Sequence, residues 1–577
     1  MKKYLFLAAL SLAMLPAAAQ DTYENARLLG SDLNGTARYV GMGGALDALG
    51  ADISLTGTNP AGIGLFRRNT VSASFGIVNQ DDVHKFDKVG KTNLSFDQIG
   101  FVYSSQTARN SFLNFAFNYH KSRNFNQILS IANQNMVRHN GQGASLGKLA
   151  YGKSTLGNVN KGGYYIIDDG KQADGYQNGS GKIRANTFTQ WDYLYTNGVL
   201  WDAVNDPAPD DPISSPYFDP NNPKDINFWN TFFEASDYNF DRAHSGWIAD
   251  YDFTLSGNIN NRVFLGITVG VHSVNYKGYS EYQEFLVDRM GQGIGNIVLA
   301  DERKITGTGA DIKVGAIVRP FEDSPFRFGV SIQTPTWYDL KSENTSVMIN
   351  ATDYAASHPT FINWGYDEYY SGETYEFKYY TPWKFGLSLG HTIDDYLALG
   401  AGFEYADYST ADNRVNDGYD SYGNPDSYSD NVMNNHTEHT LKGVSTFRLG
   451  AEFKPDPCFA VRLGYNYLSP MYEKNGVRDT RLNSMGNWYS STADYTNWDA
   501  THRITCGLGY KYEGWNFDVA YQYSATKGTF YPFQPDMTFK DIVPNVDGNI
   551  IDETNICTPS DVKFNRHQLL FTVGYTF

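Results

Sequence analysis

The stretch from Val263 to His272, VFLGITVGVH, decides the fold. Every second residue from Val263 to Val271 is a branched apolar residue, while glycine, threonine and other residue types fill the positions between them. A period of two is typical of a β-strand with one apolar and one mixed face. Because the same alternation returns many times along the 577 residues, the sequence predicts an all-β protein.

Fourteen such segments of about ten residues, the length of a tilted membrane-spanning strand, follow residue 70. We expect strands at 70–80, 93–104, 111–120, 247–258, 262–276, 308–319, 326–334, 380–391, 396–406, 441–454, 458–468, 500–512, 515–525 and 565–577. Short joints such as Ser105–Asn110 and Ile259–Asn261 alternate with long connections, of which 121–246 is the largest. The sequence therefore predicts a 14-stranded antiparallel transmembrane β-barrel over residues 70–577.

The charged residues of these strands fix which face points inward. Five of them fall opposite the apolar face: Glu404, Arg448, Glu452, Arg462 and Asp518. A basic residue facing lipid near the midplane costs about 2–4 kcal/mol, so we expect these side chains to line a polar interior. Aromatic residues near the predicted strand ends fit interfacial girdles. These are Trp247, Tyr276, Trp383, Tyr396, Tyr408 and Trp515.

Both ends of the chain carry targeting features. Residues 1–19 combine Lys2 and Lys3 with an apolar run and a small-residue end, which predicts a secretory signal peptide cleaved near Ala19. The final strand ends on the aromatic Phe577 and resembles the signal by which barrel assembly machinery recognises outer-membrane proteins. We therefore expect the Gram-negative outer membrane as the location, with its lipids and this machinery as partners.

Composition excludes several other classes. After the signal no stretch of about 18 apolar residues remains, so a transmembrane helix is not expected. The net charge of −17 argues against a nucleic-acid partner. Three scattered cysteines do not make a disulfide framework, although a pairing such as Cys458 with Cys557 stays open.

A glycine-rich stretch from Thr36 to Leu65 precedes the first strand. It is unlike a dinucleotide-binding loop, because position 46 is Leu46 instead of the third glycine and no buried strand leads into it. The other interpretations are a disordered arm and a compact plug. Glycine allows close backbone approach and Asn59–Pro60 forms a tight turn, so the composition suits a plug.

The mature chain resembles the FadL family of outer-membrane transporters for long-chain fatty acids and other hydrophobic compounds. The resemblance rests on Arg38–Ala45, RYVGMGGA, followed by Asn59–Gly62, NPAG, and on hairpins such as 447–455 with 461–465. It implies an N-terminal hatch, here residues 20–69, inside the barrel. It also implies a lateral gap where the third strand, here 111–120, bends inward. The expected gating residues are Gly41, Gly43, Gly44, Asn59, Pro60, Ala61 and Gly62.

The long 121–246 connection holds two further candidates for ligand capture. Residues 124–137, NFNQILSIANQNMV, fit a short amphipathic helix. Phe228, Trp229, Phe232 and Phe233 add aromatic surface for capturing a hydrophobic ligand. The alternative is that both stretches only pack the scaffold.

Reaction chemistry finds little support in the sequence. His436 and His439 lack a third metal ligand at a recognised spacing, and the pair Asp210–Asp211 is not part of an EF-hand. No nucleophile motif occurs, although an outer-membrane phospholipase stays open because adjacency across strands is not readable. We expect no enzyme activity, no cofactor and no metal. A TonB-dependent receptor would need a larger plug and about 22 strands.

The sequence thus predicts passive uptake of hydrophobic small molecules through a hatch-gated barrel. Fatty acids follow from the family resemblance, while haem, aromatic hydrocarbons and sterol-like compounds stay open as ligands. The alternative function is that of a non-transporting surface barrel with an adhesin or structural role, which would use the long outer loops for protein contacts.

Overall fold

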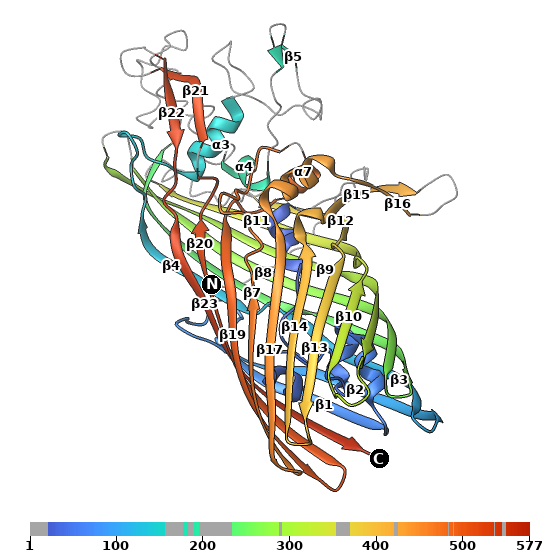
Figure 1. Cartoon of the computed structure of the whole chain (residues 1–577). Coiled ribbons are helices and arrows are strands. Elements are labelled where there is room, and N and C mark those ends of the chain that lie inside the picture. Colours follow the sequence, from blue (N-terminus) through green and yellow to red (C-terminus); the bar gives the residue numbers. More distant parts are fainter. Residues whose placement is uncertain are drawn as a thin grey trace.

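The computed structural model describes residues 21–155, 177–178, 181–182, 189–195, 233–287, 291–352, 370–419, 425–482, 484–488, 490–535, 537–544 and 550–577. Fourteen antiparallel strands form a closed barrel (Figure 1). They are β1 (Thr70–Gln80), β2 (Thr92–Ala108), β3 (Ser111–Asn124), β7 (Glu234–Ile259), β8 (Val263–Val287), β9 (Gly293–Val318), β10 (Arg327–Gln333), β13 (Lys384–Ile393), β14 (Leu397–Asp407), β17 (Gly443–Asp456), β18 (Phe459–Leu468), β19 (Tyr495–Tyr512), β20 (Trp515–Tyr531) and β23 (Ser560–Thr576). The last strand closes the barrel by pairing with β1, Val71 opposite Tyr575. Each predicted strand has its counterpart.

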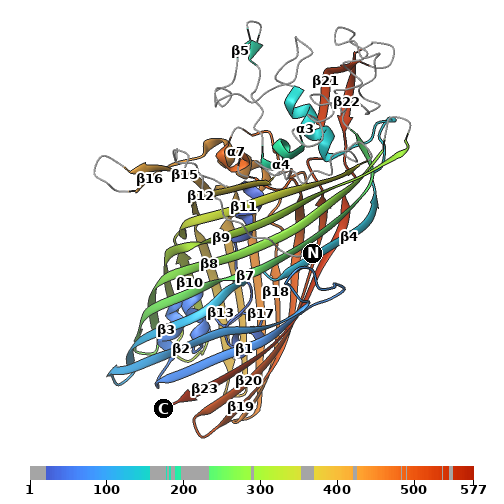
Figure 2. The same cartoon turned by 180° about the vertical axis from the view of Figure 1, so that it is seen from behind.

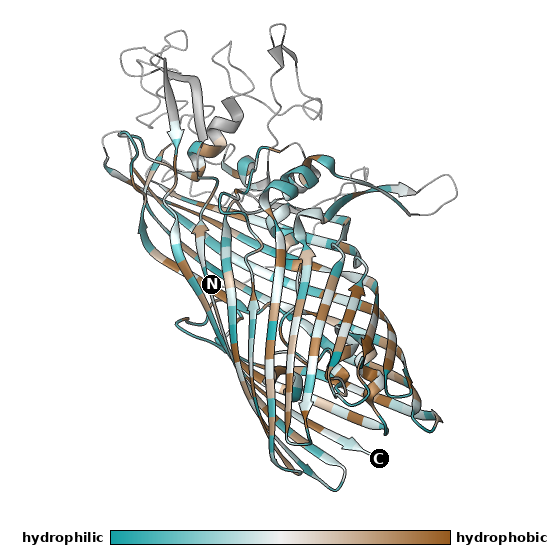
Figure 3. Ribbon diagram, in the orientation of Figure 1, coloured by the Kyte–Doolittle hydropathy of each residue, from teal (hydrophilic) through white to brown (hydrophobic). Residues whose placement is uncertain are grey.

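The outer face of the barrel is apolar. On β8, Leu265 is 49% exposed and Ile267 44%, whereas Thr268 between Ile267 and Val269 is 0% exposed. Figure 3 shows the same alternation as bands of opposite hydropathy along the strands. An apolar surface that surrounds a barrel requires lipid, so the strands span a membrane. No helix among the described residues is both long and apolar enough to cross a membrane.

Two of the predicted girdle residues point the other way. Tyr276 is 1% exposed and Tyr408 4%, so both are buried inside. Tyr276 lies an even number of residues from Thr268 and shares its inward face, which the period of two dictates. Trp247, Trp383, Tyr396 and Trp515 are exposed as expected.

Short turns join the strands at the end of the barrel where the C-terminus lies (Figure 1). Glu513 and Gly514 connect β19 and β20 with φ of 45° and 88°, the left-handed pair of a tight hairpin turn. Asn260 and Asn261 also adopt positive φ between β7 and β8. The predicted division into short turns and long connections is thus confirmed.

At the opposite end the strands of the wall lead into the long connections (Figure 2). β7 and β9 have 26 residues each, well above the roughly ten that cross a bilayer. Further elements extend this end: β4 (Gln127–Asn135), α3 (Leu146–Thr155), β5 (Gln177–Asn178), β6 (Gly181–Lys182), α4 (Gln190–Tyr195), β11 (Trp337–Thr352), β12 (Tyr370–Tyr380), η6 (Tyr408–Thr410), β15 (Asp412–Tyr419), β16 (Pro425–Ser429), α7 (Asn431–Thr440), α8 (Met485–Trp488), β21 (Met537–Pro544) and β22 (Ile550–Asn555).

The helix expected over 124–137 is wrong, because β4 occupies this stretch. It pairs with β7, Ile128 opposite Ala243, so the neighbouring strand overrides a weak helical pattern. Together with the early start of β7 at Glu234, this shortens the 121–246 connection.

Phe233 packs against a buried cluster. Four other candidate residues lie outside the described residues: Asp210, Asp211, Phe228 and Trp229. Phe232 lies outside them as well.

The open cysteine pairing is not formed. Cys458 and Cys557 are both free, as is Cys506. Cys458 follows β17 at the short-turn end, whereas Cys557 precedes β23 at the opposite end. The barrel therefore holds Cys458 and Cys557 far apart.

Candidate functional site

Residues 21–69, the N-terminal segment, lie inside the barrel (Figures 1 and 2). The segment forms α1 (Thr22–Asn25), η1 (Ala26–Leu28), α2 (Ala37–Gly41), η2 (Ile53–Gly57) and η3 (Pro60–Leu65). Helices this short are not stable alone, and side chains cap four of them. Asp21, Thr36, Asp52 and Asn59 accept hydrogen bonds from the first-turn amides.

A row of glycines on the inner wall receives this segment. Gly390, Gly400, Gly450 and Gly464 are direct partners across β13, β14, β17 and β18. A Cβ added to Gly400 would come under 3.0 Å from the carbonyl oxygen of Ala45. Cβ atoms on Gly450 and Gly464 would likewise meet the backbone of Met42 and Gly43. The wall therefore lacks side chains where the segment backbone touches it.

The predicted gating residues lie at this contact and at a second one. Gly43 and Gly44 have φ of 63° and 80°, and a Cβ on Gly43 would lie 2.8 Å from the amide nitrogen of Tyr465. Gly41 faces Gly507, with 3.3 Å from its added Cβ to the Gly507 Cα. Asn59, Pro60 and Ala61 lie against Gly266 and Gly315 on β8 and β9, while Gly62 packs on Leu55 within the segment.

The glycines on the barrel wall that make these contacts were not predicted from the sequence. The inward positions of neighbouring strands repeat glycine at one level, and this repeat is readable once strand registers are aligned. A glycine at an inward position shows where another backbone comes close.

Ion pairs tie the segment to the predicted polar interior. Arg38 Nε lies 3.1 Å from Glu452 Oε2, which Arg462 also contacts at 2.7 Å. Arg448 binds Asp47 of the segment at 3.2 Å and Glu404 at 2.7 Å. Asp518 pairs with Arg462 at 2.5 Å. The inward placement of all five predicted charged strand residues is thus confirmed.

A second cluster of charges, absent from the sequence prediction, holds η2. His272 lies 2.7 Å from Asp250 and 2.9 Å from Asp311, and Lys313 lies 3.2 Å from Asp252. Thr56 of the segment donates to Asp252 at 3.0 Å. These groups come from β7, β8 and β9, so only the barrel brings them together.

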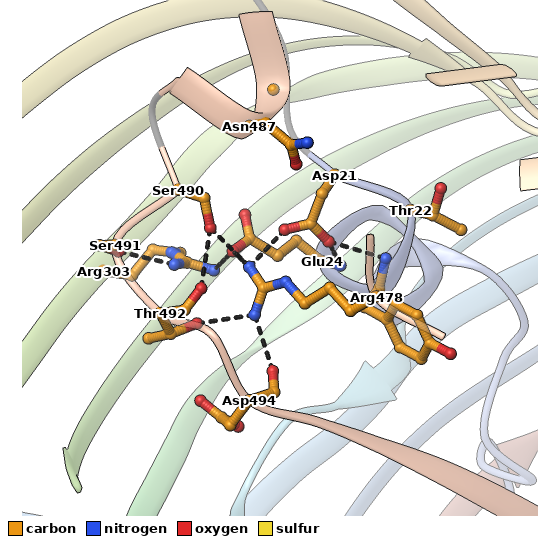
Figure 4. A network of polar contacts seen from close by, with 12 residues as sticks. Asp21, Thr22, Glu24, Arg303, Arg478, Asn487, Ser490, Ser491, Thr492 and Asp494 are labelled. Carbon is orange, nitrogen blue, oxygen red and sulfur yellow. Dashed lines mark hydrogen bonds and ion pairs between the residues drawn. The ribbon is translucent and has the colours of Figure 1, made fainter. Parts of the chain in front are cut away.

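The beginning of the segment is fixed at the long-loop end (Figure 4). Arg478, from the β18–β19 connection, binds Asp21 and donates to Glu24 Oε1 at 2.8 Å. Arg303 of β9 pairs with Glu24 and donates to Ser491 at 2.7 Å. Burial raises the pKa of the Asp21 carboxyl, but Arg478 and Arg303 outweigh it and hold that pKa below its usual range. These four charged residues are at most 2% exposed.

The two histidines considered for metal binding support the same contact. His436 and His439 lie on α7, and His436 Nδ1 is 2.8 Å from Thr22 Oγ1 of the segment. Its Nε2 lies 2.8 Å from the carbonyl oxygen of Val477. Both ring nitrogens of His436 therefore bind protein groups. Within the part of the chain that the structure describes, no three or more His, Cys, Asp or Glu side chains are arranged so that they could hold a metal ion.

The barrel wall contains a seam beside β3. The β2–β3 ladder ends at Gln98 opposite His120. Beyond it, residues 92–96 pair with β1, and Lys121, Arg123 and Asn124 pair with β7, but the two sets do not pair with each other. The resemblance placed the gap within 111–120. In the structure residues 112–120 are paired with both neighbours, and the seam begins after them.

The N-terminal segment fills this seam from inside. The Asp32 amide donates to the Ser122 carbonyl at 2.7 Å, and the Asn124 amide donates to Asp32 Oδ2 at 2.9 Å. The Asn34 amide group donates to the Lys121 carbonyl and to Asp97 Oδ1, each at 3.0 Å. The segment thus satisfies backbone groups that the missing ladder leaves without strand partners.

Cavities lie along the segment. One of about 190 Å³ adjoins the seam and is lined by Asp32 of the segment, by Arg123 at the end of β3 and by Phe564 of β23. A second of about 90 Å³ shares residues 29–32 with it and reaches His272. A third of about 460 Å³ lies beyond Thr36 and Asp52 at the short-turn end. The segment therefore separates the third cavity from the other two.

No protein-family model matches the chain, and no curated protein matches it. Several solved structures are similar. A Pseudomonas aeruginosa FadL homologue has a TM-score of 0.46 and 11% identity, covering 95% of this chain and 99% of that one. The Ralstonia pickettii toluene transporter TbuX has a TM-score of 0.44 and 11% identity, covering 94% and 99%. The P. putida toluene transporter TodX has 0.43 and 11%, covering 95% and 99%. The similar structures thus include a homologue from the family that the sequence resembles.

Proposed function

We propose that this chain is an outer-membrane protein that admits hydrophobic small molecules by passive diffusion, and that its N-terminal segment is the hatch. The observation that carries the proposal is the position of Asp32 and Asn34. They close the seam from inside, next to a cavity that Asp32 lines together with Arg123 and Asn124 of β3. A shift of these residues would join the cavity to the membrane side of the wall.

Such a shift breaks four hydrogen bonds across the seam and the ion pairs of Asp32 with Arg503 and Arg566. Each hydrogen bond across the seam contributes about 0.5–1.5 kcal/mol net. Arg38, Asp47 and the glycine row hold the rest of the segment independently of the seam. The gate is therefore a local movement of residues near 32–34, while the body of the hatch stays seated. Neither nucleotide hydrolysis nor redox chemistry is needed for this movement.

In this proposal the two glycine-rich contacts serve the gate by holding the body of the hatch in place while residues near 32–34 move. Gly41, Gly43 and Gly44 seat the hatch on β17–β19, and residues 59–62 seat it on β8 and β9. The lipids of the membrane would surround the apolar face, and the final strand would be the element recognised during assembly. The signal peptide of residues 1–19, cleaved near Ala19, would direct export.

A reversible crosslink tests the gate. Asn34→Cys with Asp97→Cys places two thiols where a 3.0 Å hydrogen bond joins the side chains now. Cys458→Ala and Cys506→Ala remove the exposed thiols. In a Gram-negative host without its own channel for such compounds, uptake of radiolabelled oleate, toluene and 2,6-naphthalenedicarboxylate is measured before and after reduction. We expect the oxidised form to block uptake and the reduced form to restore it.

The outcomes separate the two functions. Equal uptake in both states, with the crosslink verified, overturns the seam as the route. Uptake of none of the three probes by the reduced form would instead favour the adhesin or structural alternative. The reduced form of the same variant is the matched control, since it differs only in the bond.

A further inference from the structure

The cavity beside the seam is lined by an excess of positive charge. One carboxylate, Asp32, and five guanidinium groups occur among its described lining residues, the latter from Arg27, Arg123, Arg242, Arg503 and Arg566. Asp494, which is not among the lining residues, pairs with Arg242. The arginines therefore outnumber the carboxylates that contact them.

The contacts of these arginines leave capacity for an anion. Arg503 and Arg566 share Asp32, at 3.8 Å and 3.4 Å, and both are at most 6% exposed. Their Nε atoms are buried without a hydrogen-bond partner. Arg27 donates to the hydroxyl of Tyr276 at 2.7 Å and Arg123 to the carbonyl of Leu29 at 2.5 Å. Among the described residues, no carboxylate lies within 4.0 Å of Arg27 or Arg123.

Uncompensated positive charge inside the barrel is unfavourable. A buried cation without an opposite charge loses hydration that protein dipoles replace only in part. The planar guanidinium offers paired donors that match a carboxylate. Asp32 and Asp494 leave more than one positive charge without a carboxylate, so a ligand with two negative groups compensates the cavity better than one with a single group.

Aromatic rings form part of the remaining lining, beside aliphatic and polar side chains. Tyr23 lies 5.1 Å from Tyr472 and 4.7 Å from Tyr495 between ring centroids. Trp498 lies 6.3 Å from Phe564 between ring centroids. All five rings line the cavity, whose volume of about 190 Å³ suits a compact molecule better than a long acyl chain. Flat rings pack well against such side chains.

We propose that this cavity binds a compact aromatic ligand with two negatively charged groups, of the class of an aromatic dicarboxylate. The inference goes beyond the proposed function, because a dianion is not one of the hydrophobic molecules that would leave through the seam toward lipid. It rests on that function only for the access of the ligand to the lumen. The apolar body contacts the aromatic rings, and the two anionic groups contact the arginines.

A charge series on one ring system tests the proposal. Binding of 2,6-naphthalenedicarboxylate, 2-naphthoate and neutral 2-naphthamide to the full chain in non-ionic detergent is measured by calorimetry, with micelles alone as the blank. We expect the dianion to bind at least about tenfold more tightly than the monoanion, and the neutral amide most weakly. Equal affinities, or a preference for the amide, overturn the proposal.

Two variants assign the preference to the cavity. Arg27→Gln with Arg123→Gln should reduce the affinity for the dianion about tenfold and leave that for the amide unchanged. Arg262→Gln, an exposed arginine at a short turn that donates to the Pro320 carbonyl, is the matched control and should change neither affinity. Retained mobility of the unheated barrel in SDS gels verifies folding. A dianion preference that survives the double substitution contradicts the assignment.

Binding and uptake fail separately. If oleate or toluene is taken up but calorimetry shows no preference for the dianion, the transport function is supported and the proposed ligand class is overturned. If the dianion binds with the expected preference but no probe is taken up, the binding site is supported and the transport function is overturned.

Discussion

Gly400 on β14 faces the backbone of Ala45 so closely that its Cβ, if it had one, would come under 3.0 Å from the Ala45 carbonyl oxygen. The next two strands repeat the relationship, with Gly450 against Met42 and Gly464 against Gly43. In each case the neighbour is backbone, which cannot move aside by changing a rotamer. The wall and the N-terminal segment are therefore complementary at the level of the main chain.

This complementarity predicts a position-specific effect of a single methyl group. Gly400→Ala should displace the segment at a cost of about 1–3 kcal/mol, because the added Cβ overlaps backbone. Gly402→Ala is the matched control, since it lies two residues along the same strand and its Cβ would sit 3.5 Å from the nearest atom. We expect faster proteolysis of residues 36–65 in the first variant only. Equal cleavage in both variants would show that the glycine row is not needed to seat the segment.

Arg478 should be the residue on which the first turn of the segment depends most. Arg478→Ala leaves Asp21 and Glu24 with less positive charge around them, and breaking such a buried pair costs about 3–5 kcal/mol. Arg481→Ala is a suitable control, because its side chain is 40% exposed and pairs with Asp479 only two residues away. Hydrogen exchange of the amides of residues 22–28 should rise strongly for the first variant. Protection equal to that of the control would mean that other contacts hold α1.

The seam should respond to acid through Asp32. Burial raises the pKa of this carboxyl, but Arg566, Arg123 and Arg503 outweigh it, so the net pKa lies below the ordinary 3.8. A carboxyl whose pKa is lowered in the folded protein contributes its full stabilisation of the closed seam at any pH above its ordinary pKa. This contribution is lost as the pH falls through the lowered pKa. We therefore expect exchange of the Asn124 amide to increase below about pH 4.

Asp32→Asn provides the control for this pH dependence. The variant cannot titrate at this position, so its Asn124 amide should exchange faster at neutral pH and lose the acid-induced rise. An unchanged acid response in the variant would assign the titration to another carboxyl.

The strands were predictable because each follows from its own ten or so residues. The alternation in β8 is complete within Val263–Val271, and the charges at Arg448 and Arg462 fix the register without tertiary information. Tyr276 was wrongly predicted to face the membrane interface, because it lies near a predicted strand end. The period of two in the same strand would have placed it on the inward face. The stretch 124–137 was misread because the partner of β4, the first part of β7, is over a hundred residues away.

The cavity was beyond the sequence for a different reason. Its arginines come from η1, β3, β7, β19 and β23, and only barrel closure brings Arg27 near Arg566. Glycines 41, 43 and 44 were recognisable because they are adjacent in the chain. The glycines that receive them are separated by tens of residues and become a row only through the strand register.

Gln80 provides a last test, because the seam continues past β3 between β1 and β4, where no strand ladder forms among the described residues. The Gln80 side chain, at the end of β1, bridges to β4 there. Its Nε2 donates to the Ile128 carbonyl at 2.7 Å, and its Oε1 accepts from the Ile128 amide at 2.8 Å. Gln80→Leu removes both bonds and leaves two buried backbone groups without these partners, which costs about 1–3 kcal/mol for each group. The seam beside β4 should then open more often, so exchange of the Ile128 amide and uptake of the probes should both rise. Gln106→Leu is the control, since Gln106 also donates to backbone carbonyls but is exposed near the β2–β3 turn. If Gln80→Leu speeds exchange without raising uptake, the β4 side of the seam is not part of the route, and passage is confined to the part that Asp32 and Asn34 close.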